Sequence, residues 1–181
     1  MNSSEKAKIS KIILRNWTRE DFNIVRDILI KTWKAAYTFI PEEDLIFHLE
    51  KFYSFKELNK MIEDINIRGI IAEANKNPSA FMKLYIDRGS DRFYVSSLYV
   101  LPEYQGYGIG NKLINTAERE ASQNNFDRIW LGVMKSNIKT LEWYKKLNFI
   151  FIEEEPFTVG KTVVQHLIGY KLIERQVSPS E

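Results

Sequence analysis

The segment that decides the fold is residues 98–113, which read Leu98-Tyr99-Val100-Leu101-Pro102-Glu103-Tyr104-Gln105-Gly106-Tyr107-Gly108-Ile109-Gly110-Asn111-Lys112-Leu113. Aromatic and β-branched residues over 92–100 favour a strand. Pro102 lacks a backbone donor and ends that strand, and apolar residues after Gly110 recur at helical spacing. The segment therefore predicts a strand, a glycine-rich loop and a helix.

Alternate glycines at a strand-to-helix junction favour an anion site. Glycine lets the backbone fold tightly, so that successive N–H groups face one concavity beside the positive end of the helix dipole. Such a site binds phosphate. A dinucleotide-binding loop would need a third glycine where Asn111 stands, and a P-loop would need Gly-Lys-Ser/Thr, which is absent. The alternative is that the glycines only form a tight turn.

The spacing Gln105-x-x-Gly108-x-Gly110 resembles the motif Gln/Arg-x-x-Gly-x-Gly/Ala of the GNAT superfamily of acyl-CoA-dependent N-acetyltransferases. The resemblance implies that acetyl-CoA is the co-substrate and that this loop holds its pyrophosphate. The implied contacts are Gln105, Gly106, Tyr107, Gly108, Ile109, Gly110 and Asn111. It also implies that a backbone N–H among Leu98, Tyr99 and Val100 polarises the thioester carbonyl.

A second informative segment, residues 137–149, resembles the GNAT pattern Asn-x-x-Ala-x-x-x-Tyr-x-Lys-x-Gly-Phe. It matches at Asn137, Tyr144, Lys146 and Phe149, whereas Thr140 and Asn148 replace the usual alanine and glycine. Asparagine is the next choice after glycine for a left-handed helix C-cap. The resemblance implies that Asn137 and Lys146 contact the coenzyme and that Tyr144 is the general acid for the leaving thiolate. The alternatives are a simple N-cap for Asn137 and a core position for Tyr144.

Composition limits the classes of function. The chain has 181 residues, 26 Lys and Arg against 24 Asp and Glu, and no cysteine. The near balance of charge gives no field that would select nucleic acid or a membrane. The absence of cysteine excludes disulfides, thiolate metal sites and a cysteine acyl-enzyme, and we expect no metal. Without a signal-like N-terminus or a membrane-spanning run, we expect a cytoplasmic monomer or homodimer.

The chain as a whole predicts one α/β domain over residues 9–174, with flexible termini at 1–8 and 175–181. The expected strands are 9–17, 68–75, 79–87, 92–100, 128–134, 150–157 and 162–172, with helices starting near Thr18, Pro41, Ser54, Gly110 and Asn137. This order resembles the GNAT fold, a mixed, splayed β-sheet flanked by helices. A crossover helix joins strands 92–100 and 128–134, so they should be parallel.

The general base and the acceptor are less well determined by sequence. Glu73, within a predicted strand, is one candidate base, and the alternative is a solvated strand face. His166 lies in the middle of the last predicted strand, where we expect a packed, hydrogen-bonded histidine, and a functional role is the alternative. Two acidic clusters, residues 42–44 and 153–155, would favour a polycation at the acceptor site.

Residues 32–37 and 98–110 resemble those of PaiA-type spermidine/spermine acetyltransferases, which implies a small-molecule amine, a polyamine, as acceptor. Two alternatives remain open. The acceptor could be a protein N-terminus or a lysine, or the chain could be a catalytically idle acyl-CoA-binding regulatory module, because a glycine loop binds coenzyme whether or not turnover follows.

Overall fold

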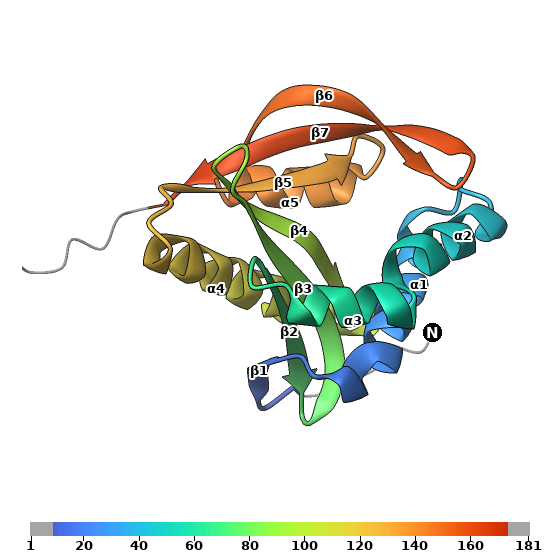
Figure 1. The fold of residues 1–181 in the computed structure, drawn as a ribbon, viewed down its shortest axis with the longest axis horizontal. Coiled ribbons are helices and arrows are strands. Elements are labelled where there is room, and N and C mark those ends of the chain that lie inside the picture. Colours follow the sequence, from blue (N-terminus) through green and yellow to red (C-terminus); the bar gives the residue numbers. More distant parts are fainter. Residues whose placement is uncertain (1–8, 174–181) are drawn as a thin grey trace, which may run out of the picture.

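The computed structural model describes residues 9–173. Position 174 and the two expected flexible termini lie outside the described residues. The strands are β1 (Ile12–Asn16), β2 (Ile67–Ala74), β3 (Asn77–Asp87), β4 (Arg92–Val100), β5 (Arg128–Met134), β6 (Ile150–Val159) and β7 (Thr162–Leu172). The helices are α1 (Phe22–Ala36), α2 (Glu42–Tyr53), α3 (Phe55–Glu63), α4 (Ile109–Gln123) and α5 (Ile138–Lys146), with 3-10 turns η1 (Arg19–Asp21) and η2 (Pro102–Tyr104) (Figure 1).

The predicted order of strands and helices is confirmed, with small shifts at the boundaries. The first strand covers only the middle of residues 9–17, and η1 separates Thr18 from α1. The connection between the strands expected at 68–75 and 79–87 is a tight turn, because Asn75 (φ 50°) and Lys76 (φ 71°) both adopt the left-handed conformation. This conformation at two consecutive residues closes a two-residue hairpin, so Pro78 already lies in β3.

The seven strands form one mixed sheet in the order β1-β2-β3-β4-β5-β7-β6. Every neighbouring pair is antiparallel except β4 and β5, which are parallel as predicted. The β4–β5 ladder has one recorded pair, Tyr94 with Trp130. Beyond this pair the two strands diverge (Figure 1), which confirms the splayed sheet.

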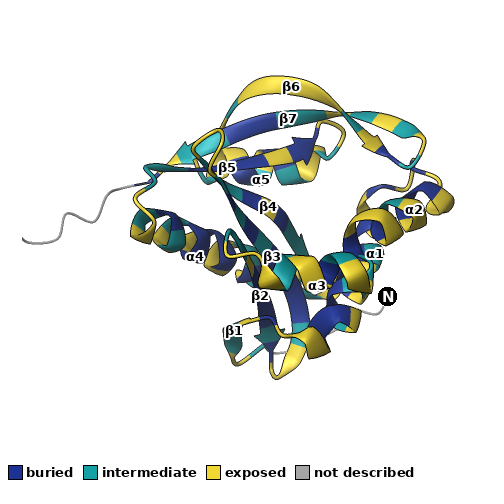
Figure 2. Cartoon of the chain, viewed as in Figure 1, coloured by how far each residue is buried: buried dark blue, intermediate teal, exposed yellow. Residues whose placement is uncertain are grey.

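Both faces of the sheet are covered around its centre. Alternate residues of β3 show this, because Met82 packs with α4 and α5 in one core cluster, whereas Phe81 packs with α1, α2 and α3 in the other. Burial on both faces explains the nearly continuous apolar sequence of β2 and β3. The edge strand β6 is largely exposed (Figure 2). Within residues 9–173, none of the helices has the length and apolar character needed to cross a bilayer.

Candidate active site

A cavity of about 950 Å³ opens where β4 and β5 diverge. Its walls come from β4, β5, the glycine loop, the start of α4, α5, the end of α1, α2 and the β6–β7 hairpin. Most site residues predicted from sequence line it: Leu98, Tyr99, Val100, Gln105, Gly106, Gly108, Ile109, Gly110, Asn111, Asn137 and Tyr144. Segments far apart in the chain thus meet at one cavity.

The glycine loop has the backbone conformation that an anion cradle requires. Gly106 (φ 85°) and Gly108 (φ 79°) are both left-handed, and Gly108 is the N-cap of α4. A Cβ atom built on Gly108 would meet no protein atom within 4 Å, so this position faces open space in the cavity wall. The first residues of α4, Ile109 to Asn111, line the same cavity, at the positive end of the helix dipole. These residues fit a bound phosphate group.

Three residues of the glycine segment, residues 105–111, have structural roles that their motif does not indicate. A Cβ on Gly110 would lie 2.9 Å from Cζ2 of Trp143, so glycine here allows α5 to approach α4 closely. The Trp143 indole N–H donates to Asn111 Oδ1 at 3.1 Å and locks the two helices together. Gln105 Nε2 donates to the Val100 carbonyl at 3.0 Å and braces the loop against the end of β4.

Helix α5 carries the other predicted site residues. The Asn137 side chain accepts a hydrogen bond from the Thr140 amide at 3.4 Å, so Asn137 is the N-cap of α5 and also lines the cavity. Tyr144 follows two turns later, is 6% exposed, and lines the same cavity. Burial, with a contribution from the nearby Tyr37, raises the pKa of Tyr144 well above its usual range. The hydroxyl therefore keeps its proton at neutral pH.

An aromatic wall at the other end of the cavity was missed by sequence reasoning. It consists of Trp33, Tyr37, His48, Tyr53, Phe157 and His166. Trp33 lies at its centre, because its ring meets those of His48, Tyr53 and Tyr99 edge to face at 5.5 to 5.9 Å. The spacing of four between Trp33 and Tyr37 shows that they share a helix face, but only the tertiary structure shows what that face meets.

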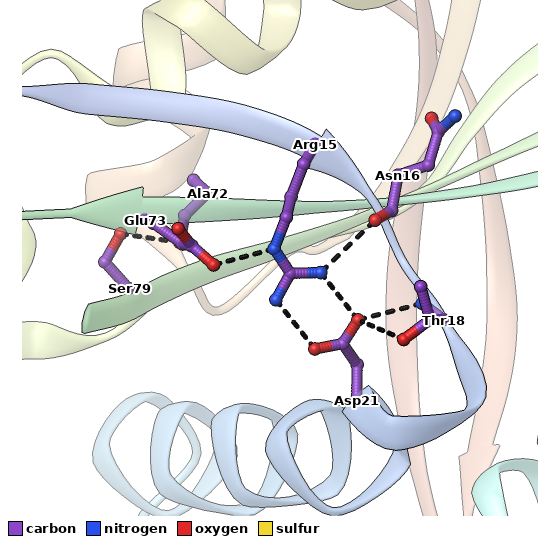
Figure 3. Close-up of polar contacts among 7 residues, drawn as sticks. All are labelled: Arg15, Asn16, Thr18, Asp21, Ala72, Glu73 and Ser79. Carbon is purple, nitrogen blue, oxygen red and sulfur yellow. Dashed lines mark hydrogen bonds and ion pairs between the residues drawn. The ribbon is translucent and has the colours of Figure 1, made fainter. Parts of the chain in front are cut away.

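Three predicted site residues do not line the cavity. Tyr107 and Lys146 are outside it, and Lys146 is exposed on α5. The candidate base Glu73 is also outside the cavity, and its carboxylate accepts a hydrogen bond from Arg15 Nε at 2.6 Å (Figure 3). The same guanidinium binds the buried Asp21 through both of its terminal nitrogens, at 2.7 and 2.8 Å. Glu73 therefore belongs to a structural network between β1, β2 and η1.

The first acidic cluster, residues 42–44, lies outside the cavity lining, and two of its side chains, Glu42 and Asp44, have partners within the protein. Glu42 pairs with Lys34. Asp44 is 6% exposed and accepts hydrogen bonds from the Lys161 amide at 2.9 Å and the Thr162 hydroxyl at 2.6 Å. The Thr162 hydroxyl and the Lys161 N–H lower the pKa of Asp44. This carboxylate ties the β6–β7 hairpin to α2, which lie side by side in Figure 1.

The second acidic cluster, residues 153–155, contributes one carboxylate to the cavity. Glu153 pairs with Arg92, and Glu154 accepts hydrogen bonds from Lys135 at 2.9 Å through both oxygens. Glu155 lines the cavity, and it is the one carboxylate among the lining residues. The sequence predicted two acidic clusters at the acceptor site, but of their six side chains only that of Glu155 belongs to a residue that lines the cavity.

Comparison with known proteins assigns the family. The profile of the acetyltransferase (GNAT) family matches residues 22–149, which include both coenzyme motifs. The chain belongs to the acetyltransferase (GNAT) family. It is an N-acetyltransferase with the GNAT fold, and acetyl-CoA is the co-substrate typical of this family.

Individual relatives are distant. The chain is 27% identical to a spermidine N(1)-acetyltransferase of Vibrio cholerae over 161 residues, which cover 84% of this chain and 88% of that protein. In structure it resembles PaiA N-acetyltransferase from Thermoplasma acidophilum in complex with coenzyme A, with TM-score 0.76, 23% identity, and coverage of 90% and 99%. It also resembles the spermidine N-acetyltransferase from Vibrio cholerae in complex with CoA and spermine, with TM-score 0.70, 23% identity, and coverage of 93% and 99%.

Proposed function

We propose that this GNAT protein transfers the acetyl group of acetyl-CoA to a primary amine by direct attack, and that the amine is a polyamine. The observation that carries the proposal is the single cavity joining a glycine loop, Tyr144 and an aromatic wall with one carboxylate. One end is built for phosphate and the other for a cation with an apolar body. The reacting carbonyl belongs between them.

The coenzyme end is assigned to the loop and to the edge of β4. Backbone amides at the start of α4, after Gly108, hold the pyrophosphate, and Lys139, which lines the cavity, adds a positive charge. Beyond Tyr94 the ladder to β5 records no further pair, so the β4 backbone from Leu98 to Val100 faces the cavity. A backbone N–H of this stretch polarises the thioester carbonyl, as an oxyanion-hole donor does.

Tyr144 is assigned as the general acid. The bound coenzyme supplies a thioester, and its cleavage by an amine expels a thiolate that must be protonated. Tyr144 lines the cavity, and its hydroxyl is protonated at neutral pH, since the ordinary pKa of a tyrosine is about 10 and burial raises it further. It can therefore donate a hydrogen bond to the leaving sulfur and then its proton.

The polyamine acceptor is supported by the chemistry of the far wall and by relatives. Aromatic faces attract ammonium groups and pack against the methylene chain between them. Glu155 supplies one negative charge for a distal ammonium group. The relative from Vibrio cholerae is a spermidine N(1)-acetyltransferase, and the identity of 27% makes this support indirect.

An acceptor screen tests the proposal. The protein is mixed with acetyl-CoA and, in separate reactions, spermidine, spermine, a singly charged alkylamine of equal length, a lysine peptide and a peptide with a free N-terminus, and thiol release is measured. We expect spermidine or spermine to give the highest kcat/KM. Glu155→Gln should lower it by up to about fivefold for polyamines and by less than about twofold for the monoamine, since one exposed charge contact is worth at most about 1 kcal/mol.

Three other outcomes of the screen would contradict the proposal at different levels. Equal kcat/KM for spermine and the monoamine at low salt would remove the polyamine. A clear preference for either peptide would assign the acceptor to a protein. No thiol release with any amine, together with normal acetyl-CoA binding, would favour an idle coenzyme-binding module.

A further inference from the structure

Both histidines of the chain line the acceptor end of the cavity, and the mechanism above uses neither. His166 lies on β7, where the sheet ladders place it opposite Glu155 of β6 and Met134 of β5. His48 lies on α2. Because Glu73 is outside the cavity and paired with Arg15, the reaction lacks an assigned group to take the proton that the amine must lose.

The His166 ring is held in a defined orientation. It stacks on Phe157 with centroids 4.1 Å apart and planes within 8°. On the neighbouring strand, a Cβ atom at Gly132 would lie 3.3 Å from His166 Nδ1, so glycine leaves room for this edge of the ring. Gly132 itself lines the cavity, on the part of β5 that has separated from β4. The Nδ1 edge of His166 therefore lies beside the gap between the two strands.

The ring nitrogens of His166 are available to a bound molecule. Half-buried imidazoles normally hydrogen-bond to other protein groups. Within residues 9–173, neither ring nitrogen of His166 has such a partner, and neither is sealed from solvent. This differs from the packed, hydrogen-bonded histidine expected from sequence. His48 contacts Trp33, Phe52 and Phe157 through its ring and forms part of the wall.

The surroundings keep His166 uncharged. Burial, with a smaller effect of His48, lowers the pKa of His166 to about 4. Burial also lowers the pKa of His48, with contributions from Lys51 and Lys83. The charged side chain opposite His166 in the β6–β7 ladder is Glu155, while Glu154 of β6 pairs with Lys135, which directly follows β5. An alkylamine, by contrast, has a pKa of about 10 and arrives as an ammonium ion.

We propose that His166 is the catalytic base, which accepts the proton that the acceptor's nitrogen loses before attack, directly or through one water molecule. The inference rests on the proposed N-acetyltransferase function. The ammonium ion gives one proton to the imidazole, which releases it to solvent, and the freed nitrogen lone pair forms the bond to the carbonyl carbon. The carbon–sulfur bond then breaks, and the thiolate takes the Tyr144 proton. The second proton that the nitrogen loses restores the Tyr144 hydroxyl, so one ammonium ion and one thioester yield one amide, one thiol and one proton.

The test is the pH dependence of kcat/KM for the amine in wild type and His166→Gln. The wild-type reaction needs the neutral imidazole of His166 and the ammonium form of the substrate. Both forms predominate from about pH 5 to 9, so kcat/KM of wild type should be constant over this range. Without the base only the neutral amine reacts, and kcat/KM should rise about tenfold per pH unit up to about pH 10. The loss at pH 7 should be about 100- to 1000-fold and should shrink as the pH rises.

Matched variants separate this role from packing. His48→Gln removes the other cavity imidazole and should keep the flat profile, with its effect confined to KM for the amine. His166→Ala should regain activity when imidazole is added to the assay. Unchanged acetyl-CoA affinity in each variant confirms that it is folded.

Specific results would overturn the base assignment. The first is that wild type is active and its pH profile of kcat/KM runs parallel to that of His166→Gln. The second is that His48→Gln shows the same change in the slope of this profile as His166→Gln. Wild type that acetylates no amine would instead remove the proposed function itself, so the two failures are distinguishable.

Discussion

The backbone carbonyl of Tyr144 accepts a hydrogen bond from the Phe149 amide at 3.1 Å, and their rings meet edge to face with centroids 5.1 Å apart. The Asn148 amide also donates to the Lys145 carbonyl at 2.9 Å, and Asn148 is left-handed with φ 67°. Together these contacts form a Schellman C-cap. The last turn of α5, which carries the proposed general acid, is thus fixed by the residue pair that follows it.

A pair of substitutions at Asn148 tests this cap. Asn148→Ala should lower the free energy of unfolding by about 1 kcal/mol, because alanine pays the full cost of a left-handed conformation. Asn148→Gly should be neutral or slightly stabilising, since glycine adopts this conformation freely. Chemical denaturation measures both. Equal stability of the two variants would show that the left-handed cap contributes nothing.

Gly108→Ala should weaken acetyl-CoA binding at least tenfold. The added methyl group meets no protein atom within 4 Å and projects into the space assigned to the coenzyme. Calorimetry measures the affinity. Asn125→Ala is the matched control, because Asn125 also has a positive φ (65°) and lies outside the cavity lining, so it carries similar backbone strain without touching the loop. Normal affinity in folded Gly108→Ala would contradict the assigned coenzyme site.

Asp21→Asn should lower the free energy of unfolding by about 1–3 kcal/mol, because it weakens charge-assisted hydrogen bonds to Arg15. The Arg15 guanidinium is the main cause of the lowered pKa of Asp21. A depressed folded-state pKa contributes stability that is complete above the ordinary value of about 4 and is lost as the pH falls through the folded value. The difference in the free energy of unfolding between wild type and Asp21→Asn should therefore be constant above about pH 5 and should shrink as the pH falls further. A difference independent of pH would contradict an ionic contribution.

Glu73→Gln should leave kcat/KM within about twofold of wild type, since Glu73 lies outside the cavity and binds Arg15. Its effect should appear in stability, measured by denaturation under the same conditions as for Asp21→Asn. A loss of a hundredfold in kcat/KM without a change in stability would restore Glu73 as the base.

Local patterns predicted much of this fold, because they depend on residues close in sequence. The turn chemistry and periodicity around the glycine loop are local, and the crossover helix between β4 and β5 makes the two strands parallel. The left-handed C-cap at Asn148 was likewise predicted from residue type and is confirmed.

Long-range side-chain contacts could not be predicted in the same way. The contact that requires Gly110 comes from Trp143, and the partner that occupies Glu73 is Arg15, on another strand. The acidic clusters were read as cation sites because their partners, such as Lys34 and Lys135, come from elements that only the tertiary fold brings near. The accessible nitrogens of His166 depend in the same way on its neighbours in the sheet.

The most direct measurement is single-turnover acetyl transfer from acetyl-CoA to spermidine by wild type and Tyr144→Phe, with the acetylated amine detected by mass spectrometry. The variant keeps the ring that packs on Phe149 and loses only the hydroxyl. We expect wild type to form acetylspermidine, and we expect the variant to be about 10- to 1000-fold slower with acetyl-CoA affinity little changed. Equal rates in the two proteins would contradict the role of Tyr144, and no acetylated product from wild type with spermidine or any other primary amine would contradict the account as a whole.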